Sequence, residues 1–203
     1  MMKMCLTFES YQNKFVVMKK LITLLVMALL ALPVFSQELS PKEQRKLEKE
    51  LRKEQKAEAA TQQAALVDAM VQYQRFVLEA NTLRDKRGNM VQVSSNINFV
   101  AADSLTGVIQ VGSNLYIGAN GVGGQTVEGT ISKYEYIKNE KNGTYTVSYY
   151  LQTPVGSYDV RMTAFPDGRA DADVSSTTWG GRLRYSGYLV PPGISRVYKG
   201  MSL

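Results

Sequence analysis

The spacing of hydrophobic and polar residues changes three times along this chain. A continuous apolar run, Leu21–Leu32, comes first, and the segment 42–60 that follows later is dominated by charged residues. Apolar residues then recur every three or four positions, which predicts an amphipathic helix over Gln63–Arg87. From Asn89 onward apolar and polar residues alternate, as is typical of β-strands with one buried face.

The alternating part of the chain divides into about seven strands separated by short turns. The predicted strands are Val91–Phe99, Gly107–Val111, Thr126–Lys138, Thr144–Gln152, Ser157–Phe165, Arg169–Ser175 and Arg182–Leu189. No helical pattern lies between them, so consecutive strands should pair antiparallel as a meander. We therefore predict a mainly β (α+β) fold, in which the meander curves toward a barrel or sandwich and one N-terminal helix packs on it.

Tyrosines gather in the strands on either side of one predicted hairpin. If Asn142-Gly143 forms a two-residue turn, Tyr136 lies opposite Tyr149. A set of four tyrosines then shares one sheet face, where we expect core packing: Tyr134, Tyr136, Tyr145 and Tyr149. Outward aromatic residues are better placed to contact a partner. These are Tyr150, Tyr188 and Trp179.

A second hairpin positions the best carboxylate cluster of the chain. A three-residue loop at Pro166-Asp167-Gly168 sets Arg161 opposite Asp173 and Thr163 opposite Asp171. Asp171 and Asp173 could form an acid/base pair or contribute to a calcium site. Calcium prefers six or more oxygen ligands, which this loop does not offer, so we favour a solvated strand face with Asp173 paired to Arg161.

The N-terminal part of the chain has the features of a secretory signal peptide. Met18-Lys19-Lys20 supplies positive charge before the apolar run, and Pro33 ends it. Cleavage is expected between Ser36 and Gln37. The run of about 12 residues is shorter than the roughly 20 that span a membrane, so a membrane anchor is the weaker alternative. Residues 1–36 would then be an upstream extension and a signal peptide, with Met18 as the expected start.

Cysteine position and net charge narrow the compartment and the partners. The single cysteine, Cys5, lies upstream of the apolar run, so no cysteine follows it for acylation. We expect a periplasmic or secreted protein with no membrane span in the mature chain. Four lysines and one glutamate lie in the first 36 residues, so cleavage lowers the net charge from +6 to +3. Such a weak charge does not indicate a nucleic-acid partner.

Residue content also excludes several reaction classes. The chain has no histidine, and the predicted mature part has no cysteine. Histidine-dependent nucleophiles and zinc sites with thiolate or imidazole ligands are therefore excluded. No serine precedes a lysine by three positions, as a Ser–Lys catalytic motif requires. We expect no cofactor and no metal, and an enzyme is disfavoured.

The stretch GANGVGGQTVEG, Gly118–Gly129, is rich in glycine. A phosphate-binding loop would need a lysine and a hydroxyl residue after the last glycine, followed by a helix. Here Gln125-Thr126 follow Gly124 and the chain continues as a strand. The glycines should mainly serve positive φ angles or close approach of another segment. A second role is the rim of a ligand site, with the candidate residues Asn120, Gly121, Gly123, Gly124 and Trp179.

Several of these motifs together resemble a known family. Asn98-Phe99-Val100, the sequence VIQVG and the Gly118–Gly129 stretch are similar to a domain-of-unknown-function family of exported proteins common in Bacteroidetes. The resemblance extends over about Tyr73–Val190. It implies an exported single domain, and it brings no activity, substrate or catalytic residue.

The patterns divide the chain into four parts and leave three functions open. After residues 1–36 come a charged helical or flexible spacer (37–62), a helix-plus-β domain (63–190) and a C-terminal tail (191–203); the spacer starts with a capping-box pattern at Ser40 and Glu43. We predict an exported, non-catalytic cell-envelope module that binds a ligand or a partner protein. The alternatives are an envelope-polymer hydrolase that uses the aspartate pair, and a structural assembly component that docks through its charged N-terminal helix.

Overall fold

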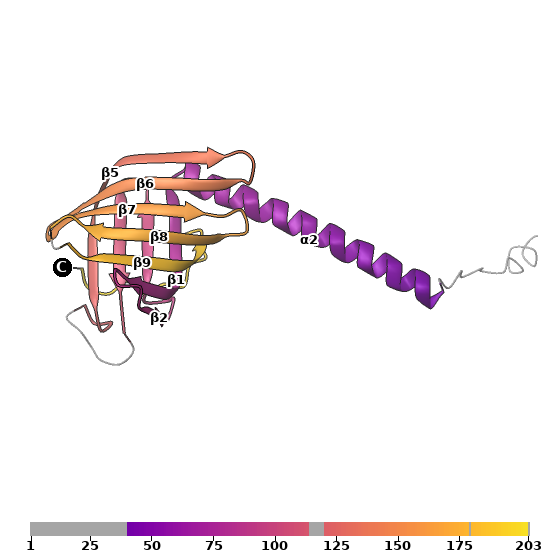
Figure 1. Ribbon diagram of the computed structural model, residues 1–203, viewed down its shortest axis with the longest axis horizontal. Helices are drawn as coiled ribbons and strands as arrows, with labels where there is room; N and C mark the ends of the chain where they lie inside the picture. Colours follow the sequence, from indigo (N-terminus) through magenta and orange to yellow (C-terminus); the bar gives the residue numbers. More distant parts are fainter. Residues whose placement is uncertain (1–39, 114–119, 179, 203) are drawn as a thin grey trace, which may run out of the picture. The chain divides into compact units, whose positions relative to one another are not determined.

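The computed structural model describes residues 40–113, 120–178 and 180–202 (Figure 1). The chain divides into two compact units, Met1–Glu50 and Leu51–Leu203. In the first unit, Ser40 and Glu43 form the predicted capping box at the start of helix α2 (Pro41–Gln72). The backbone N–H of Ser40 donates to Glu43 Oε2 at 2.9 Å, and the backbone N–H of Glu43 donates to Ser40 Oγ at 3.4 Å. Two backbone donors at the helix start are thereby satisfied.

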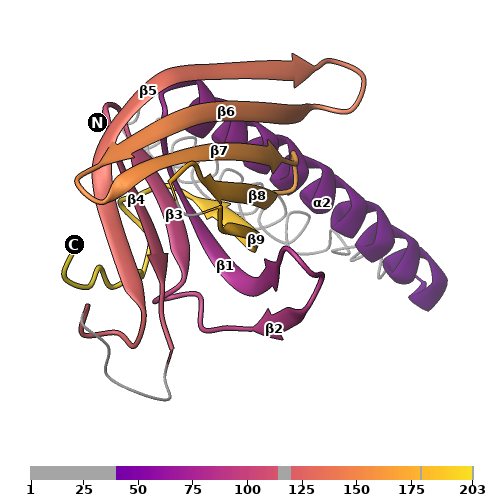
Figure 2. The same cartoon turned by 60° about the vertical axis from the view of Figure 1, so that its left-hand side comes forward.

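The second unit contains an antiparallel sheet of nine strands that closes into a barrel. The strands are β1 (Arg75–Asp85), β2 (Met90–Gln92), β3 (Phe99–Asp103), β4 (Thr106–Val111), β5 (Gln125–Asn139), β6 (Thr144–Thr153), β7 (Gly156–Ala164), β8 (Arg169–Ser176) and β9 (Arg182–Val190). Each strand from β3 to β9 pairs with the next, and β1 pairs with both β3 and β9 (Figure 2). These eight strands form a closed barrel, and the short β2 pairs beside the second half of β1. The predicted mainly β fold with one packed helix is confirmed.

Helix α2 contributes to the hydrophobic core through its last two turns. Val67, Met70 and Val71 are buried and belong to the same core as the inward side chains of the strands. The Tyr134 hydroxyl donates to the backbone oxygen of Val71 at 2.8 Å, and Lys138 Nζ lies 2.8 Å from Asp68 Oδ2. The helix therefore covers the barrel end at which β5 ends and β6 begins.

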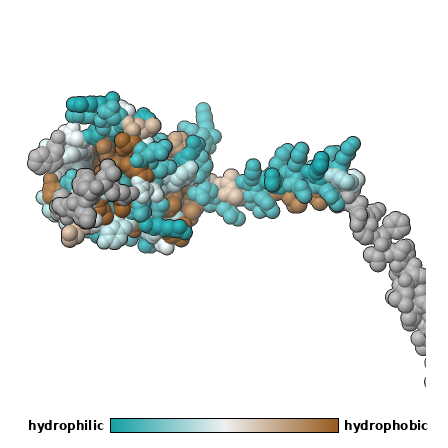
Figure 3. All heavy atoms as spheres, turned by 90° about the horizontal axis from the view of Figure 1, so that it is seen from below, coloured by the Kyte–Doolittle hydropathy of each residue, from teal (hydrophilic) through white to brown (hydrophobic). Residues whose placement is uncertain are grey.

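The earlier part of α2 has no such contacts. Residues 41–62 are exposed throughout, and hydrophilic residues dominate the helix surface in Figure 3. Leu47 and Leu51, one turn apart, are about half exposed. The narrow apolar stripe explains why this stretch buries nothing.

The predicted helix over Gln63–Arg87 is wrong in its second half. The helix ends at Gln72, and Arg75–Asp85 is strand β1 instead. Gln74 has a φ of 55°, which stops the helix, and Phe76, Val77 and Leu78 are all buried. A run of consecutive buried apolar residues fits a strand covered on both faces better than an amphipathic helix. The helix-like spacing of apolar residues therefore continued into strand β1 by coincidence.

The predicted strand Val91–Phe99 is also two strands in the structure. β2 ends at Gln92 and β3 begins at Phe99, with a turn between them in which Asn98 Nδ2 donates to the backbone oxygen of Ser94 at 2.9 Å. β2 pairs with one half of β1 and β3 with the other half. Apolar and polar residues do alternate between Val91 and Phe99, but the middle of this segment forms a turn and not a strand.

The hairpin between β5 and β6 has a longer loop than predicted. Asn139 pairs with Thr144, which leaves four residues in the loop, and Tyr136 lies opposite Val147 and not opposite Tyr149. The side chain of Asn139 accepts a hydrogen bond from the backbone N–H of Lys141 at 3.0 Å, which stabilises this wider turn. The predicted two-residue turn is therefore wrong.

The register of the hairpin between β7 and β8 is confirmed. Arg161 lies opposite Asp173 and Thr163 opposite Asp171. Gly168 has a φ of 85°, as the predicted three-residue loop requires. Here the alternation of small apolar and charged residues was strong enough to choose the loop length.

Candidate functional site

A cavity of about 610 Å³ lies inside the barrel, at the end away from the last turns of α2. At this end β4 and β8 finish, and β5 and β9 begin. The lining residues are Ile109, Val111, Gln125, Val127, Val155, Tyr158, Val174, Ser176, Gly181, Arg182, Leu183 and Tyr185. The volume falls within the range of small-molecule sites. Aliphatic and tyrosine side chains make up most of the lining, so the cavity suits an apolar ligand.

The sequence explains why space remains at this end of the barrel. An eight-stranded barrel is just wide enough to be filled by side chains or to hold one small ligand. At the helix end, α2 adds Val67, Met70 and Val71 to the core, and Tyr145 fills the start of β6. At the cavity end the inward positions of β4, β5 and β8 carry medium-sized residues such as Ile109, Val127 and Val174. Their side chains leave the middle of the barrel open.

Two tyrosines line the cavity. Tyr158 lies at the start of β7, and Tyr185 lies on β9 and is only 1% exposed. Burial raises the pKa of Tyr158. Burial, and then the neighbouring Tyr158, raise the pKa of Tyr185. Both phenols therefore stay protonated at neutral pH and can donate hydrogen bonds.

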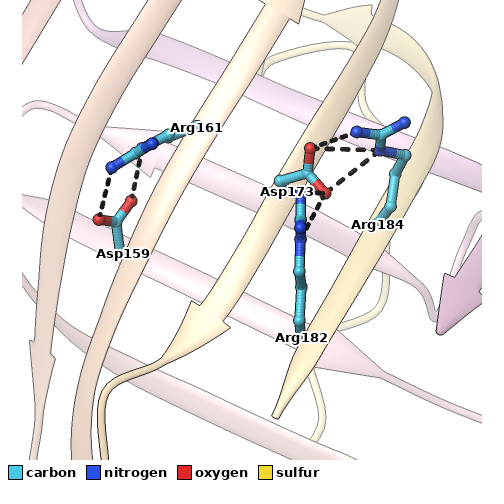
Figure 4. Close-up of polar contacts among 5 residues, drawn as sticks. All are labelled: Asp159, Arg161, Asp173, Arg182 and Arg184. Atoms are coloured by element: carbon cyan, nitrogen blue, oxygen red, sulfur yellow. Dashed lines mark hydrogen bonds and ion pairs between the residues drawn. The ribbon is translucent and has the colours of Figure 1, made fainter. Parts of the chain in front are cut away.

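The charged groups near this end of the barrel pair with each other. Asp173 on β8 accepts hydrogen bonds from two arginines of β9 (Figure 4). The Arg184 Nη2 atom lies 2.6 Å from Asp173 Oδ2, and Arg182 Nη2 lies 3.1 Å from Asp173 Oδ1. The predicted ion pair between Asp173 and Arg161 is wrong, because Arg161 pairs with Asp159 on its own strand at 3.4 Å. Arg182 lines the cavity and is already engaged by a carboxylate.

The two candidate catalytic aspartates do not converge on one site. The Asp171 carboxylate accepts a hydrogen bond from the hydroxyl of Ser186, and it borders a surface depression with Phe165. Asp173 borders a different depression, together with Arg84. Neither aspartate lines the 610 Å³ cavity. Two carboxylates that act on one glycosidic bond must face the same substrate, and this arrangement does not provide that.

Acid should weaken the contribution of Asp173 to stability. Partial burial raises the pKa of Asp173, but Arg184 and Arg182 outweigh burial and hold this pKa below its usual range. A carboxyl group whose pKa is lower in the folded chain than in the unfolded chain stabilises the fold at pH values above its unfolded pKa, which is about 3.9. This stabilisation is lost as the pH falls through the folded pKa. Asp173→Asn should therefore lower the free energy of unfolding by about 1 kcal/mol at pH 7. The difference from wild type should shrink near pH 3.

Urea denaturation at both pH values measures this difference. Asp103→Asn is the matched control, because Asp103 and its ion-pair partner Arg75 are both more than half exposed. A difference between Asp173→Asn and wild type that grows on acidification would contradict the assigned sign.

The glycine-rich loop joins β4 to β5 at the cavity end, and 120–124 is its described part. Asn120 is buried and organises the loop: its Oδ1 accepts from the backbone N–H of Val122 at 3.1 Å and of Gly124 at 3.0 Å. Gly121 and Gly123 have φ angles of 75° and 72°. A Cβ on Gly124 would overlap the backbone oxygen of Val111. These residues serve the backbone functions expected of them, and the adjacent Gln125 and Val111 line the cavity.

The remaining candidate of the rim, Trp179, lies outside the described residues. Gly181, two positions later, lines the cavity. Tyr150 and Tyr188 are 39% and 53% exposed, so the predicted outward direction of both side chains is confirmed.

The predicted tyrosine cluster forms, although only part of it is buried. Ring centroids lie 6.0 Å apart for Tyr134 and Tyr149, and 6.0 Å apart for Tyr136 and Tyr145. Tyr145 and Tyr149 are buried in the core, whereas Tyr136 is 44% exposed. These rings lie near α2 and do not line the cavity.

A buried polar network joins the C-terminal residues to the glycine-rich loop. Gln110 on β4 is fully buried. Its Nε2 donates to the backbone oxygens of Ile97 at 3.1 Å and Tyr198 at 2.9 Å. Its Oε1 accepts from the backbone N–H of Gly200 at 2.8 Å and from Thr126 Oγ1 at 2.9 Å. Residues 198–200 are therefore built into the wall of the barrel domain.

The described residues form neither a metal-binding cluster nor a helix that could cross a membrane. Over residues 40–113, 120–178 and 180–202, no three acidic, cysteine or histidine side chains gather as they would around a metal ion. In the same part of the chain, no helix combines the length and the apolar character needed to cross a membrane.

The fold and its cavity define a closed eight-stranded antiparallel barrel with a helix over one end and a ligand-sized space at the other. The chain matches the family model described as "Domain of unknown function (DUF4251)" over residues 58–189, and it belongs to this family. It is similar to the crystal structure, at 1.95 Å resolution, of a DUF4251 family protein from Bacteroides eggerthii DSM 20697. The two chains are 31% identical with a TM-score of 0.57, over 66% of this chain and 91% of the other. No curated protein matches the chain. The predicted resemblance to a Bacteroidetes family of unknown function is confirmed.

Proposed function

We propose that this protein is an exported, non-catalytic module of the cell envelope that binds one small apolar ligand in the barrel cavity. The cavity carries this proposal: it has a volume of about 610 Å³ and a mainly apolar lining at one end of a closed barrel. Side chains usually fill a barrel of eight strands, so an interior space of this size suits a ligand. Export rests on the signal-peptide pattern of Met18–Ser36.

The hydrolase alternative receives less support from the same geometry. Asp173 is held by two arginines, and its lowered pKa is the opposite of what a general acid requires. Asp171 and Asp173 border separate depressions. A binding module needs neither group.

Filling the cavity should abolish ligand binding. Val174, on β8, is 5% exposed and lines the cavity, so a tryptophan at this position would occupy the ligand's space. The uncharged dye N-phenylnaphthylamine, which fluoresces in apolar surroundings, is a suitable probe. We expect saturable binding to the wild-type chain and an affinity at least about tenfold lower for Val174→Trp, equivalent to about 1.4 kcal/mol.

Two further variants make this experiment decisive. Val155→Trp, in the turn between β6 and β7, narrows the cavity from its rim and should also weaken binding. Val91→Trp adds the same bulk to β2 at a position that is 56% exposed, and it should bind the dye as wild type does. Circular dichroism and a cooperative thermal transition confirm that each variant is folded. Equal dye binding by all three folded variants would exclude the cavity as the site.

A further inference from the structure

We infer that the ligand is uncharged and carries a hydrogen-bond acceptor, such as an ester or ketone carbonyl, that the hydroxyls of Tyr158 and Tyr185 bind. This inference rests on the proposed function and specifies the chemical class of the ligand. Three properties of the cavity support it: its charge, its two phenols and their placement on the barrel wall.

The charge of the lining favours an uncharged ligand. No acidic residue is among the described residues that line the cavity, and Arg182 is the single basic one. The Arg182 guanidinium is already bound to the Asp173 carboxylate, with Nε and Nη2 at 3.2 and 3.1 Å from Oδ1. A carboxylate or ammonium group inside the aliphatic cavity would therefore lack a counter-charge, and burying an unpaired charge is strongly unfavourable.

The two phenols favour a hydrogen-bond acceptor. Tyr158 and Tyr185 make no hydrogen bond through their hydroxyls within the part of the chain that the structure describes. Tyr185 is 1% exposed, yet its hydroxyl is not among the buried side-chain atoms that lack a partner, which fits a hydroxyl that is open to the cavity. A phenol hydroxyl that is not used within the protein can donate to a ligand, and a neutral carbonyl oxygen can accept a bond from each of two donors. Because burial keeps both phenols protonated, they present donors over the whole neutral pH range.

The two tyrosines lie on the strands that flank β8, and both line the cavity. Tyr158 lies opposite Ser176 on β8, and Tyr185 lies opposite Ala172 on the other side of β8. Val174 is the inward residue of β8 between these two positions. Alanine and valine are small, so the two tyrosine rings can extend over β8 into the cavity.

Displacement of N-phenylnaphthylamine from the full chain tests the inference. The competitors are methyl decanoate and undecanoate, the anion of its isomer undecanoic acid, which carries a negative charge at pH 8. We expect methyl decanoate to bind wild type at least about tenfold more tightly than undecanoate, because only the ester avoids burying a charge. Tyr158→Phe and Tyr185→Phe should each weaken methyl decanoate binding about threefold to tenfold, the loss expected for one neutral hydrogen bond.

The dye itself is the internal control, because it has no carbonyl group to accept the bonds. The loss in both tyrosine variants should therefore be larger for methyl decanoate than for the dye, and the ratio of the two dissociation constants isolates the hydrogen bonds from any change in packing. Tighter binding of undecanoate than of methyl decanoate would overturn the inference, above all if Arg182→Gln removed that preference. Unchanged methyl decanoate binding in both phenylalanine variants would also overturn it. Failure of the proposed function would give a different result. In that case the dye would not bind the wild-type chain, or its affinity would be the same for wild type and Val174→Trp.

Discussion

Replacing Gly187 with alanine should destabilise the barrel by about 3 kcal/mol, the upper end of the range for overpacking. Gly187 lies on β9 opposite Ala80 of β1, at the pairing that closes the barrel. A Cβ at this position would overlap the backbone oxygen of Glu79 and lie close to the Cα of Ala80. Both are backbone atoms, so no side-chain rotation can relieve the overlap. β9 would have to move away from β1, at a point where the register already shifts.

Urea denaturation and thermal unfolding measure this effect. For a chain of this size, the loss corresponds to a fall in melting temperature of about 6 to 12 °C. Gly193→Ala is the control, because a Cβ on Gly193 meets no atom within 4 Å. The control should stay within about 0.5 kcal/mol of wild type. If the two variants were equally stable, β1 and β9 would not approach as closely as described.

Replacing Gln110 with alanine should lower the free energy of unfolding by about 2 to 4 kcal/mol and release the C-terminal residues. The four partners of the Gln110 amide are Ile97 O, Thr126 Oγ1, Tyr198 O and the N–H of Gly200. Removal of the amide leaves these polar groups without their partner in a buried site. An unpaired buried group is more unfavourable than the loss of a hydrogen bond at the surface.

Limited proteolysis provides a second readout for this variant. Arg196 and Lys199 are trypsin sites within the C-terminal residues, and Lys199 pairs with Glu128 at 2.8 Å in the folded chain. Cleavage at both sites should accelerate in Gln110→Ala before the barrel itself is digested. Gln92→Ala, at an exposed position of β2, removes the same amide without these partners and is the control. Wild-type cleavage rates in Gln110→Ala would show that other contacts hold the C-terminus.

The sequence was informative where one face of a strand is buried and the other is charged. The register between β7 and β8 follows from the alternation of Val160 and Met162 with Arg161, and it is found as predicted. The sequence misled where both faces are buried, as at Phe76–Leu78, because a continuous apolar run does not separate a strand from a buried helix. The closing strand β1 was missed for this reason.

The candidate site was only partly accessible from the sequence. The glycine-rich loop was placed correctly as a loop next to a strand, and its neighbours Val111 and Gln125 line the cavity. Tyr158 was overlooked, although it is in phase with the inward Val160 and Met162. Tyr185 could have been found from the pairing of β9 with β8. The role of Gln110 could not be predicted from the sequence, because only the three-dimensional structure brings Tyr198 and Gly200 beside it.

The pairing of β1 with β9 has a consequence for how the chain reaches its native state. Val77 lies opposite Val190, so the contact that completes the barrel joins residues more than a hundred positions apart. Loop closure over such a distance is entropically unfavourable, and proteins dominated by distant contacts fold slowly. The barrel cannot close until nearly the entire chain is available. Until then, the edge of β1 that pairs with β9 in the native barrel has no partner strand, and its apolar residues are exposed. An edge strand of this kind is prone to associate with other chains.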